Sequence, residues 1–476
     1  MKVLFAASEA VPFIKTGGLA DVAGSLPPAL KGQRVDIRVV MPLYSSIKEE
    51  YKAKMKKIAE FDVDLGWRRQ YVGVHSLTHN GVVHYFLDNE FYFKRHGLYG
   101  YYDDGERFTW FAKAATLLGK HVDFKPDLIH SNDWHSALIN LYVKDFALGD
   151  DWFQDIKTVY TIHNLKYQGT FNPVMLGEVM GVSQDYFHED GLKFFDSVNF
   201  LKAGIVYSDA ITTVSESYAD EMKNPYFGEY MDGIIRKHEH KLSGILNGID
   251  YNEYNPGKDP HIAVNYDLRS LKRKKENKTA LQEKFGLPVD GDKPMIAMVS
   301  RLVDMKGLDL VAHIFDELLS DDLQFVVLGT GDKKYEDMFR YFQDKYPDKV
   351  SARIYFNEGE AHEIYASADM FLMPSKFEPC GISQMISLRY GTVPIVREVG
   401  GLKDTVVNFD KATGEGNGFT FENYNAHDML FKIREALETY QDNEVWREII
   451  KNGMKSKNDW SESSKKYKSL YESLIK

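Results

Sequence analysis

Short apolar runs alternate with helical patterns along the first half of the chain. The runs are rich in Val, Ile, Leu, Phe and Ala, and they lie at residues 1–7, 35–41, 82–87, 128–131, 158–162 and 210–214. Between several of them apolar residues recur at the spacing of a helix, as at 108–120 and 136–146. Runs that are apolar throughout are typical of strands buried on both faces. The pattern therefore predicts a parallel sheet covered by helices on both sides.

The alternation breaks once and then starts again. Residues 254–257 read Tyr-Asn-Pro-Gly and form a turn-rich stretch that we interpret as a linker. A second series of apolar runs follows at 294–299, 323–328, 352–356, 369–373 and 393–397. The chain is therefore expected to form two α/β domains, over residues 1–250 and 251–455.

The last segment, residues 456–476, has a pattern of its own. Its apolar residues fall at i, i+3, i+4 and i+7, namely Tyr467, Leu470, Tyr471 and Leu474. That spacing predicts a helix with one apolar stripe, and Ser461 is the expected cap at its start.

Composition and charge exclude several classes of protein. A chain of 476 residues that is 43% hydrophobic can build two domains with full cores. It has 59 basic and 70 acidic residues, a net charge of −11, so neither nucleic acid nor an anionic membrane surface is expected as a partner. The basic run 272–275 does not change this, because it opens a helix predicted at 276–285 and is expected to be a solvated face.

Cysteine content and hydropathy indicate the compartment. The single Cys380 cannot form an internal disulfide, and no apolar run approaches the roughly 20 residues that a membrane helix needs. The chain opens on a predicted strand and not on a signal sequence. We therefore expect a cytoplasmic protein with no membrane partner.

A carboxylate follows one of the buried strands of the second half. The strand at 369–373 ends at Pro374, and residues 375–381 read Ser-Lys-Phe-Glu-Pro-Cys-Gly. In a parallel α/β sheet the loops at the carboxyl ends of the strands form the ligand crevice, so Glu378 is placed to meet a bound molecule. The alternative is a carboxylate that only stabilises the start of the next helix through the helix dipole.

A glycine-rich turn follows the first strand. Lys15-Thr16-Gly17-Gly18 leads into a helical pattern that starts at Leu19. Two glycines allow a close approach of the backbone, N–H groups at a helix start are expected to point outward, and Lys15 adds a formal charge. The turn is therefore predicted to bind a phosphate or a sugar phosphate.

Two cations follow the first strand of the second half. Arg301 and Lys306 lie in the loop after residues 294–299. An Arg fork and a Lys point charge in one loop can converge on a single diphosphate. From the spacing alone, two solvated loop cations remain an equal alternative.

With these three motifs in place, the chain resembles the bacterial glycogen synthases and plant starch synthases. Further motifs fall in the order of that family, namely Asn132-Asp133-Trp134-His135, Thr161-Ile162-His163-Asn164, Leu246-Asn247-Gly248-Ile249-Asp250 and Tyr390-Gly391-Thr392. The resemblance implies a GT-B glycosyltransferase, with two Rossmann-like doubly wound domains that face a deep cleft. It also implies that the carboxyl-terminal helix returns to the first domain. The reaction implied is the transfer of glucose, with retention, from ADP-glucose to the non-reducing end of an α-1,4-glucan.

The resemblance also implies roles for single residues. His163 would contact the transferred glucose, Asp133 would bind hydroxyls, and Glu378 would orient the sugar ring. Trp134 offers a flat face for a sugar ring, although core packing explains a tryptophan here equally well. Other residues expected to bind substrate are Lys15, Thr16, Gly17, Gly18, Asn164, Asn247, Tyr355, Cys380 and Gly381.

The implied chemistry needs no metal and no cofactor. No motif marks Glu378 or Asp133 as a nucleophile, so the resemblance implies a front-face substitution and not a double displacement. Arg301 and Lys306 would neutralise the departing ADP, a task that a metal ion performs in other transferases. No Asp-x-Asp motif stands in a suitable loop, so no metal site is expected.

Other donors and other classes of protein are less consistent with the sequence. Ile386 stands where many GT-B transferases have a second Glu, which favours the ADP-glucose branch over UDP-glucose. A glucan phosphorylase would need a lysine-bound pyridoxal phosphate. A dinucleotide oxidoreductase would need a third glycine after Gly329-Thr330-Gly331, which is absent. A non-catalytic glucan-binding protein would have no use for Lys15, Arg301 and Lys306 together.

Overall fold

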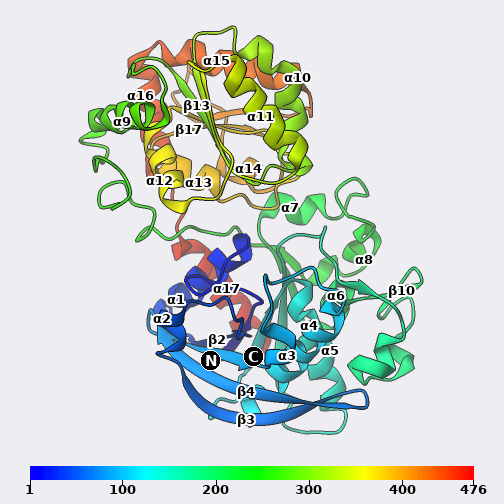
Figure 1. Cartoon of the computed structure of the whole chain (residues 1–476). Coiled ribbons are helices and arrows are strands. Elements are labelled where there is room, and N and C mark those ends of the chain that lie inside the picture. Colours follow the sequence, from blue (N-terminus) through cyan, green and yellow to red (C-terminus); the bar gives the residue numbers. More distant parts are fainter. The chain divides into compact units, whose positions relative to one another are not determined.

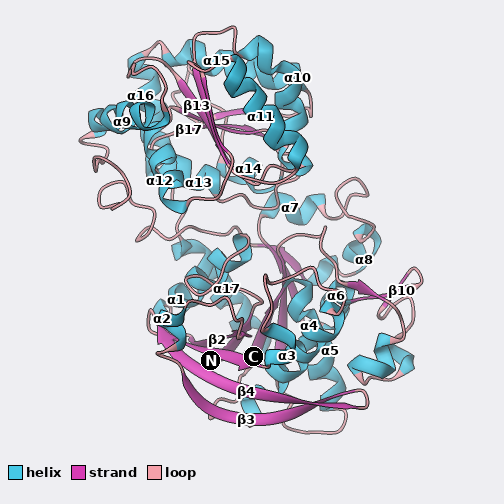
Figure 2. Ribbon diagram, in the orientation of Figure 1, coloured by secondary structure: helices cyan, strands magenta, loops and turns pink.

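The computed structural model describes all 476 residues and divides the chain into two compact units (Figure 1). The first unit comprises Met1–Gly248 together with Trp460–Lys476, and the second comprises Ile249–Asp459. Both are α/β units with a largely or wholly parallel sheet (Figure 2).

The first unit is built on one large sheet. Its strand order is β12-β11-β7-β6-β1-β2-β5-β4-β3. The parallel strands are β1 (Lys2–Ala6), β2 (Asp36–Pro42), β5 (Val82–Asp88), β6 (Leu128–Asn132), β7 (Lys157–Ile162), β11 (Ala210–Thr213) and β12 (Leu242–Gly244). All but β12 were predicted from their apolar runs, because a strand buried on both faces needs an almost wholly apolar sequence.

An antiparallel hairpin extends this sheet at one edge. It consists of β3 (Lys56–Leu65) and β4 (Arg68–His79), which form the curved lower edge of the sheet in Figure 2. The hairpin was missed because many of its residues are exposed, so its sequence mixes apolar with charged residues. A small separate sheet contains β8 (Thr170–Phe171), β10 (Ser197–Asn199) and β9 (Lys193–Phe194).

Helices cover the large sheet on both faces (Figure 1). Those of the first unit are α1 (Gly18–Gly32), α2 (Glu49–Lys52), α3 (Glu90–Phe93), α4 (Asp104–Leu117), α5 (Asp133–Ala147), α6 (Phe200–Tyr207), α7 (Glu216–Glu221), α8 (Asp232–Lys237) and α17 (Trp460–Ile475). The helices expected at 108–120 and 136–146 begin earlier, at Asp104 and Asp133.

The last helix, α17, packs within the first unit. It lies beside α1, and Tyr467 and Tyr471 of its apolar stripe are fully buried. The Tyr471 hydroxyl is 2.6 Å from Nδ1 of His130 on β6. Ser461 was expected to cap this helix, but α17 begins one residue earlier, at Trp460, so Ser461 lies inside the first turn.

The second unit has a smaller sheet that is parallel throughout. Its order is β15-β14-β13-β16-β17-β18. The strands are β13 (Met295–Val299), β14 (Gln324–Leu328), β15 (Val350–Arg353), β16 (Met370–Met373), β17 (Val393–Arg397) and β18 (Phe419–Phe421). The strand expected at 352–356 is shifted to Val350–Arg353, and the short β18 was not predicted.

Helices lie on both sides of this sheet as well, with α10 and α11 on one side and α9 and α12 on the other (Figure 1). They are α9 (Lys274–Phe285), α10 (Leu308–Leu318), α11 (Lys333–Lys345), α12 (Glu358–Ser367), α13 (Ser383–Arg389), α14 (Gly400–Thr405), α15 (Ala426–Tyr440) and α16 (Asn443–Lys455). The apolar faces of α10, α11, α15 and α16 share one core with the strands.

The basic run 272–275 is only partly a solvated face. Lys274 is 7% exposed, which contradicts that expectation. Its Nζ donates hydrogen bonds to the carbonyl oxygens of Tyr365 and Ala366, at 3.1 and 2.9 Å, and to the Thr392 hydroxyl at 2.8 Å. Burial lowers the pKa of Lys274 to about 7. The side chain therefore ties α9 to the end of α12 and to the residue before β17.

Both large sheets reverse their strand order at their first strand. In the first unit β1 lies between β2 and β6, and in the second β13 lies between β14 and β16. Ligands of open α/β sheets bind outside the carboxyl ends of the strands at such a switch point. In the first unit, the strands at the switch point lead into the glycine-rich turn and Asp133. In the second unit, they lead into Arg301, Lys306 and Glu378.

Candidate active site

The turn between β1 and α1 is organised around a buried carboxylate. Glu9 is 3% exposed. Its Oε2 accepts a hydrogen bond from the backbone N–H of Thr16 at 2.5 Å and another from the Thr16 hydroxyl at 2.7 Å. The backbone N–H of Gly17 also donates to this carboxyl group. The expectation of an outward-pointing N–H is therefore wrong for Gly17, and the Thr16 side chain points to Glu9.

Lys15 lies on the same turn and is held against the first turn of α1. Its Nζ is 2.7 Å from Oδ1 of Asp21, and the Lys15 side chain is 30% exposed. Gly17 precedes the helix in an extended conformation and gives it no side-chain cap. Lys15 is thus presented at the amino-terminal end of α1, beside Gly18.

Asp133 joins the ends of two neighbouring strands. It is the first residue of α5, with a φ of +54°, in the left-handed region that few residues other than glycine adopt. Its Oδ1 accepts the backbone N–H of His163 at 2.8 Å, and the N–H of Asn164 donates to the same carboxyl group. These bonds hold the unusual backbone in place and tie the end of β6 to the end of β7.

The ring of His163 is oriented by Asn132. Nε2 of His163 is 2.9 Å from Oδ1 of Asn132, whose Nδ2 donates to the carbonyl oxygen of Ala6 at 3.0 Å. This network assigns the ring proton to Nε2 and leaves Nδ1 as an acceptor. Burial lowers the pKa of His163 to about 3, so the imidazole is neutral at physiological pH. Such a ring is suited to accept a hydrogen bond from a hydroxyl group.

The carboxyl groups of Glu9 and Asp133 are weaker acids than usual. Burial raises the pKa of Glu9 and that of Asp133 to about 7. The negative charge of Asp21 adds to the shift at Glu9, and the charge of Glu9 adds to the shift at Asp133. Since neither carboxylate forms an ion pair with a basic side chain, only neutral donors stabilise their charged forms.

In the second unit, Lys306 and Glu378 form a close ion pair. Nζ of Lys306 lies 2.5 Å from Oε2 of Glu378, and the Ser375 hydroxyl donates to the same oxygen at 2.9 Å. The two charged side chains are only 15% and 9% exposed. The pair is therefore a fixed feature of the switch point, and not two solvated charges.

Two glycines bring the loops of this edge together. At Gly307, with a φ of +72°, an added Cβ would lie 2.0 Å from the carbonyl oxygen of Pro374. At Gly400, with a φ of +47°, it would lie 2.0 Å from the carbonyl oxygen of Glu378. Only glycine combines these dihedrals with such close backbone contact. The loops after β13, β16 and β17 are thereby locked around the Lys306–Glu378 pair.

Arg301 is the cation of this edge that has no anionic partner. It directly follows β13 and Ser300, and its side chain is exposed. The nearby Asp304 instead accepts hydrogen bonds from Lys334 and Tyr335. The second unit therefore presents one unpaired guanidinium beside a buried Lys–Glu pair, an arrangement suited to an anionic ligand with hydroxyl groups.

Comparison with known proteins identifies the family. Residues 2–237 match the model of the starch synthase catalytic domain, and residues 280–455 match glycosyl transferases group 1. The chain is 54% identical to the glycogen synthase of Finegoldia magna, with 100% of both chains covered. It is 52% identical to the glycogen synthase of Clostridium novyi, over 100% of this chain and 99% of that one. The chain belongs to the glycogen and starch synthase family. It is thus a glycosyltransferase, and the resemblance inferred from its motifs is confirmed.

Solved structures agree with the assignment of this chain to the family. The catalytic domain of starch synthase IV from Arabidopsis thaliana, solved with ADP and acarbose bound, matches it with a TM-score of 0.93 and 31% identity. That match covers 100% of this chain and 99% of the other. A sucrose-phosphate synthase from Thermosynechococcus elongatus, at 16% identity and a TM-score of 0.62, shares the fold. The α/β, GT-B fold class expected for the synthase is confirmed.

Trp134 of the synthase is a packing residue. It is 9% exposed, and its ring contacts those of Phe108, His135 and Phe171. An added Cβ at Gly169 would come within 2.3 Å of the indole. Of the two interpretations left open by the sequence, the structure favours core packing, because neighbouring groups cover the faces that a sugar would need.

The remaining residues expected to bind substrate lie in different surroundings. Asn164 uses its Oδ1 to accept the backbone N–H of Lys166 at 3.0 Å. Asn247 is 5% exposed, and its buried Oδ1 has no partner within the protein. An unpartnered buried carbonyl oxygen is an acceptor that a ligand or an ordered water can satisfy. Asn247 therefore keeps its expected binding role as a prediction.

Tyr355 and the end of the Glu378 turn differ in exposure. Tyr355 lies between β15 and α12, is 40% exposed, and donates to Oε2 of Glu360 at 2.8 Å. Cys380 is 6% exposed. Gly381 has a φ of +74°, and an added Cβ there would meet the side chain of Gln384. Cys380 and Gly381 thus shape the turn from inside, while Tyr355 offers a ring face.

Sequence reasoning missed Glu9, Asn132 and the role of Ser375. Glu9 follows a buried strand just as Glu378 does, so the rule that singled out Glu378 also applies to it. Asn132 precedes Asp133 and fixes the tautomer of His163 through a hydrogen bond. Only the folded geometry reveals this contact. Ser375 was part of the quoted motif, but its hydrogen bond to Glu378 depends on the shape of the turn.

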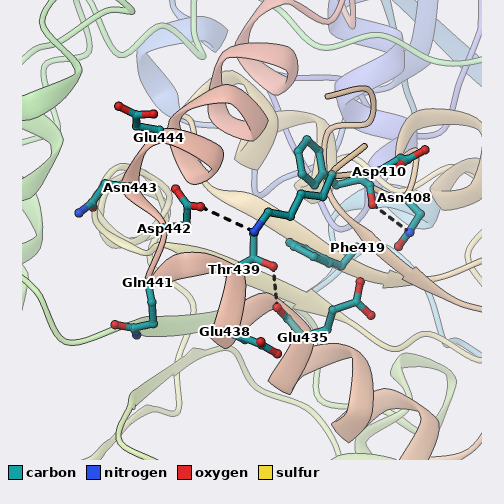
Figure 3. Close-up of a pocket in the computed structure, with 12 residues that line it drawn as sticks. Asn408, Asp410, Phe419, Glu435, Glu438, Thr439, Gln441, Asp442, Asn443 and Glu444 are labelled. Carbon is teal, nitrogen blue, oxygen red and sulfur yellow. Dashed lines mark hydrogen bonds and ion pairs between the residues drawn. The ribbon is translucent and has the colours of Figure 1, made fainter. Parts of the chain in front are cut away.

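A pocket of about 1010 Å³ lies elsewhere in the second unit, beside α15 and α16 (Figure 3). Five of its twelve lining residues are acidic, among them Glu435, Glu438 and Glu444, and its one cation, Lys411, lies 3.7 Å from Asp442. No residue of the candidate site lines it, and we assign it no part in the reaction. The structure contains no group of three His, Cys, Asp or Glu residues placed to hold a metal ion. None of its helices combines the length and the apolar character that crossing a bilayer requires.

Proposed function

We propose that this synthase transfers glucose from ADP-glucose to the non-reducing end of an α-1,4-glucan, with retention of the anomeric configuration. The observation that carries the proposal is the full-length identity of 54% and 52% to two glycogen synthases. The arrangement of charge at the two switch points supports it, because cations and hydroxyl-binding groups meet the needs of a nucleotide sugar.

The second unit supplies groups for the departing nucleotide. In the reaction the bond between the anomeric carbon and the β-phosphate oxygen breaks, and negative charge builds on the diphosphate. Arg301, which is unpaired, is suited to bind that diphosphate as a fork, and Lys306 adds a second positive charge. Glu378 keeps Lys306 in place at 2.5 Å, and the rest of its carboxylate can accept hydrogen bonds from sugar hydroxyls.

The first unit supplies groups for the sugar. Nδ1 of His163 is placed to accept a hydroxyl hydrogen bond, while Asp133 is engaged by two backbone N–H groups. A carboxylate that is held by backbone hydrogen bonds in this way is less free to attack the anomeric carbon than an unbonded one. This supports a front-face substitution: the acceptor 4-hydroxyl oxygen bonds to the anomeric carbon, and its proton passes to the departing phosphate oxygen.

Product analysis tests the proposal. The protein is incubated with ADP-glucose and a maltooligosaccharide whose reducing end carries a fluorophore, with EDTA present. We expect ladders of longer oligosaccharides that a β-amylase degrades from the unlabelled end, which shows new α-1,4 bonds at the non-reducing end. A β-linked product or the absence of extension would contradict the proposal, and activity that EDTA abolishes would contradict the metal-independent mechanism.

A further inference from the structure

A carboxylate takes up the first backbone donors of the glycine-rich turn. A turn of this kind at the start of a helix normally offers its N–H groups to an anionic ligand. Here the N–H groups of Thr16 and Gly17 are bonded to Glu9, whose carboxyl group is 3% exposed. These donors are therefore satisfied within the protein before any ligand binds.

We propose that Glu9 is a positioning residue for donor binding: its carboxylate fixes the Lys15–Gly18 turn and thereby sets where Lys15 and the start of α1 present positive charge. The inference rests on the proposed function, because it takes the donor's diphosphate or sugar as the group that the turn meets. Glu9 acts through Thr16 and Gly17 and does not itself touch the substrate.

Two features of the turn leave this task to Glu9. Helix α1 has no side-chain cap, since its capping residue is Gly17. Lys15 is bound to Asp21 at 2.7 Å, further along α1. The three donors at Glu9 thus tie the end of β1 to the turn, alongside the backbone hydrogen bond from Ile14 to Ala10, and breaking them leaves Thr16 and Gly17 without a fixed position.

The surroundings of Glu9 offer no cation that could replace these donors. The charged or titratable groups that face it are Asp21 on α1, Asp133 on α5, Tyr44 after β2 and Tyr99 before α4. None is a base, and burial raises the pKa of Glu9 to about 7. The ionised carboxylate accepts stronger hydrogen bonds than the neutral acid. With no cation nearby, the N–H and hydroxyl donors of the turn are the groups that stabilise this carboxylate.

Hydrogen exchange of the peptide that contains Thr16 and Gly17 tests this without substrate. We expect Glu9→Gln to speed exchange of these two amides by about tenfold or more, because the neutral amide is a weaker acceptor. Unchanged exchange in a folded Glu9→Gln protein would overturn the proposal.

A second variant guards against misfolding of the first. Thr16→Val removes the hydroxyl donor and keeps the charge of Glu9, whereas Thr16→Ser keeps the donor and should restore protection. Thr116→Val is the matched control: its hydroxyl donates to the carbonyl oxygen of Ala112 within α4, and its loss should leave the turn unaffected. Equal exchange in Thr16→Val and Thr16→Ser would contradict the role of this hydrogen bond.

Kinetics then connect the turn to the donor. We expect Glu9→Gln to raise KM for ADP-glucose about tenfold, with kcat changed by less than about threefold. An unchanged KM together with faster exchange would refute the link to donor binding. If the protein used no ADP-glucose at all while the exchange results held, the proposed function would fail and the positioning of the turn would stand.

Discussion

At the scale of single residues, Arg301 and Lys306 differ in what they already contact. Lys306 is compensated by Glu378 at 2.5 Å, whereas Arg301 is exposed and has no anionic partner. Removal of Arg301 should therefore cost the protein little stability and should cost the reaction much.

We expect Arg301→Ala to lower kcat by on the order of 100-fold, the scale seen when one contact to transition-state charge is lost. Arg269 is also exposed and lies outside the candidate site, so Arg269→Ala is the matched control and should keep wild-type turnover. Initial rates and thermal unfolding of both variants provide the measurement. A folded Arg301→Ala protein with normal kcat would show that this cation is a surface residue.

A second prediction at this scale concerns Asp133, whose pKa is about 7 in the folded protein. Because this value is raised above that of the unfolded chain, the stabilising contribution is fully present below about pH 4 and is lost as the pH rises through 7. An asparagine side chain cannot titrate, and asparagine tolerates the φ of +54° at this position well. We expect Asp133→Asn to gain about 2 kcal/mol in the free energy of unfolding, relative to the wild type, between pH 5 and pH 8.

Urea unfolding of both proteins at several pH values measures this difference. A free-energy difference between variant and wild type that stays constant from pH 5 to pH 8 would show that Asp133 has an ordinary pKa.

Which single residues could be predicted from the sequence depended on local chain signals. Lys15, Arg301 and Glu378 follow buried strands, so position alone singled them out. Lys274 was misjudged because its neighbours in the run are exposed, while its own side chain turns inward to Tyr365 and Ala366. That direction depends on how α9 packs on the sheet, which a charge pattern does not reveal.

At the scale of elements, the loops of the second unit are fitted to one another through their backbones. Gly400, at the start of α14, leaves no space for a Cβ against the carbonyl oxygen of Glu378, at 2.0 Å. Gly414 has a similar need for a positive φ, +73°, but faces open space.

We therefore expect Gly400→Ala to displace the Glu378 turn and to lower both stability and activity, whereas Gly414→Ala should cost only the strain of its dihedral angle, about 1 kcal/mol. Thermal unfolding and kcat/KM of the two variants measure this. Equal losses in both would mean that the contact with Glu378 has no role of its own.

The sequence predicted elements well where burial is complete. Strands β13 and β16 are apolar throughout, β1 is apolar after its first residue, and all three were found at nearly their observed bounds. The β3–β4 hairpin was missed because its exposed residues dilute the apolar pattern, and β18 because three residues are too short for a period. Helix starts were the least accurate, since α5 begins at Asp133 with a left-handed residue that no propensity favours.

At the scale of the whole molecule, the residues expected to bind the donor are divided between the two units. Lys15, Asp133 and His163 belong to the first, and Arg301, Lys306 and Glu378 belong to the second. The order of motifs along the chain was enough to predict two α/β units with a sheet in each, because each motif follows a predicted strand. The division of the chain at 248/249 lies before the linker inferred at 254–257, and the division at 459/460 lies near the boundary expected at 455/456.

The nucleotide of the donor is the property on which the account as a whole depends. Ile386 stands where a second carboxylate would read the ribose of other nucleotide sugars, and it is 4% exposed, so its side chain is part of the core. Recognition of the nucleotide must then come from other groups, of which the exposed ring of Tyr355 is one candidate.

The most direct test is a comparison of kcat/KM for ADP-glucose and UDP-glucose, measured with one maltooligosaccharide acceptor and the wild-type protein. The account predicts that kcat/KM for ADP-glucose is about 100-fold or more higher than for UDP-glucose. A site whose hydrogen-bonding groups match adenine leaves some of them unpaired when uracil binds, which costs several kcal/mol of transition-state binding. Equal or better use of UDP-glucose would contradict the account.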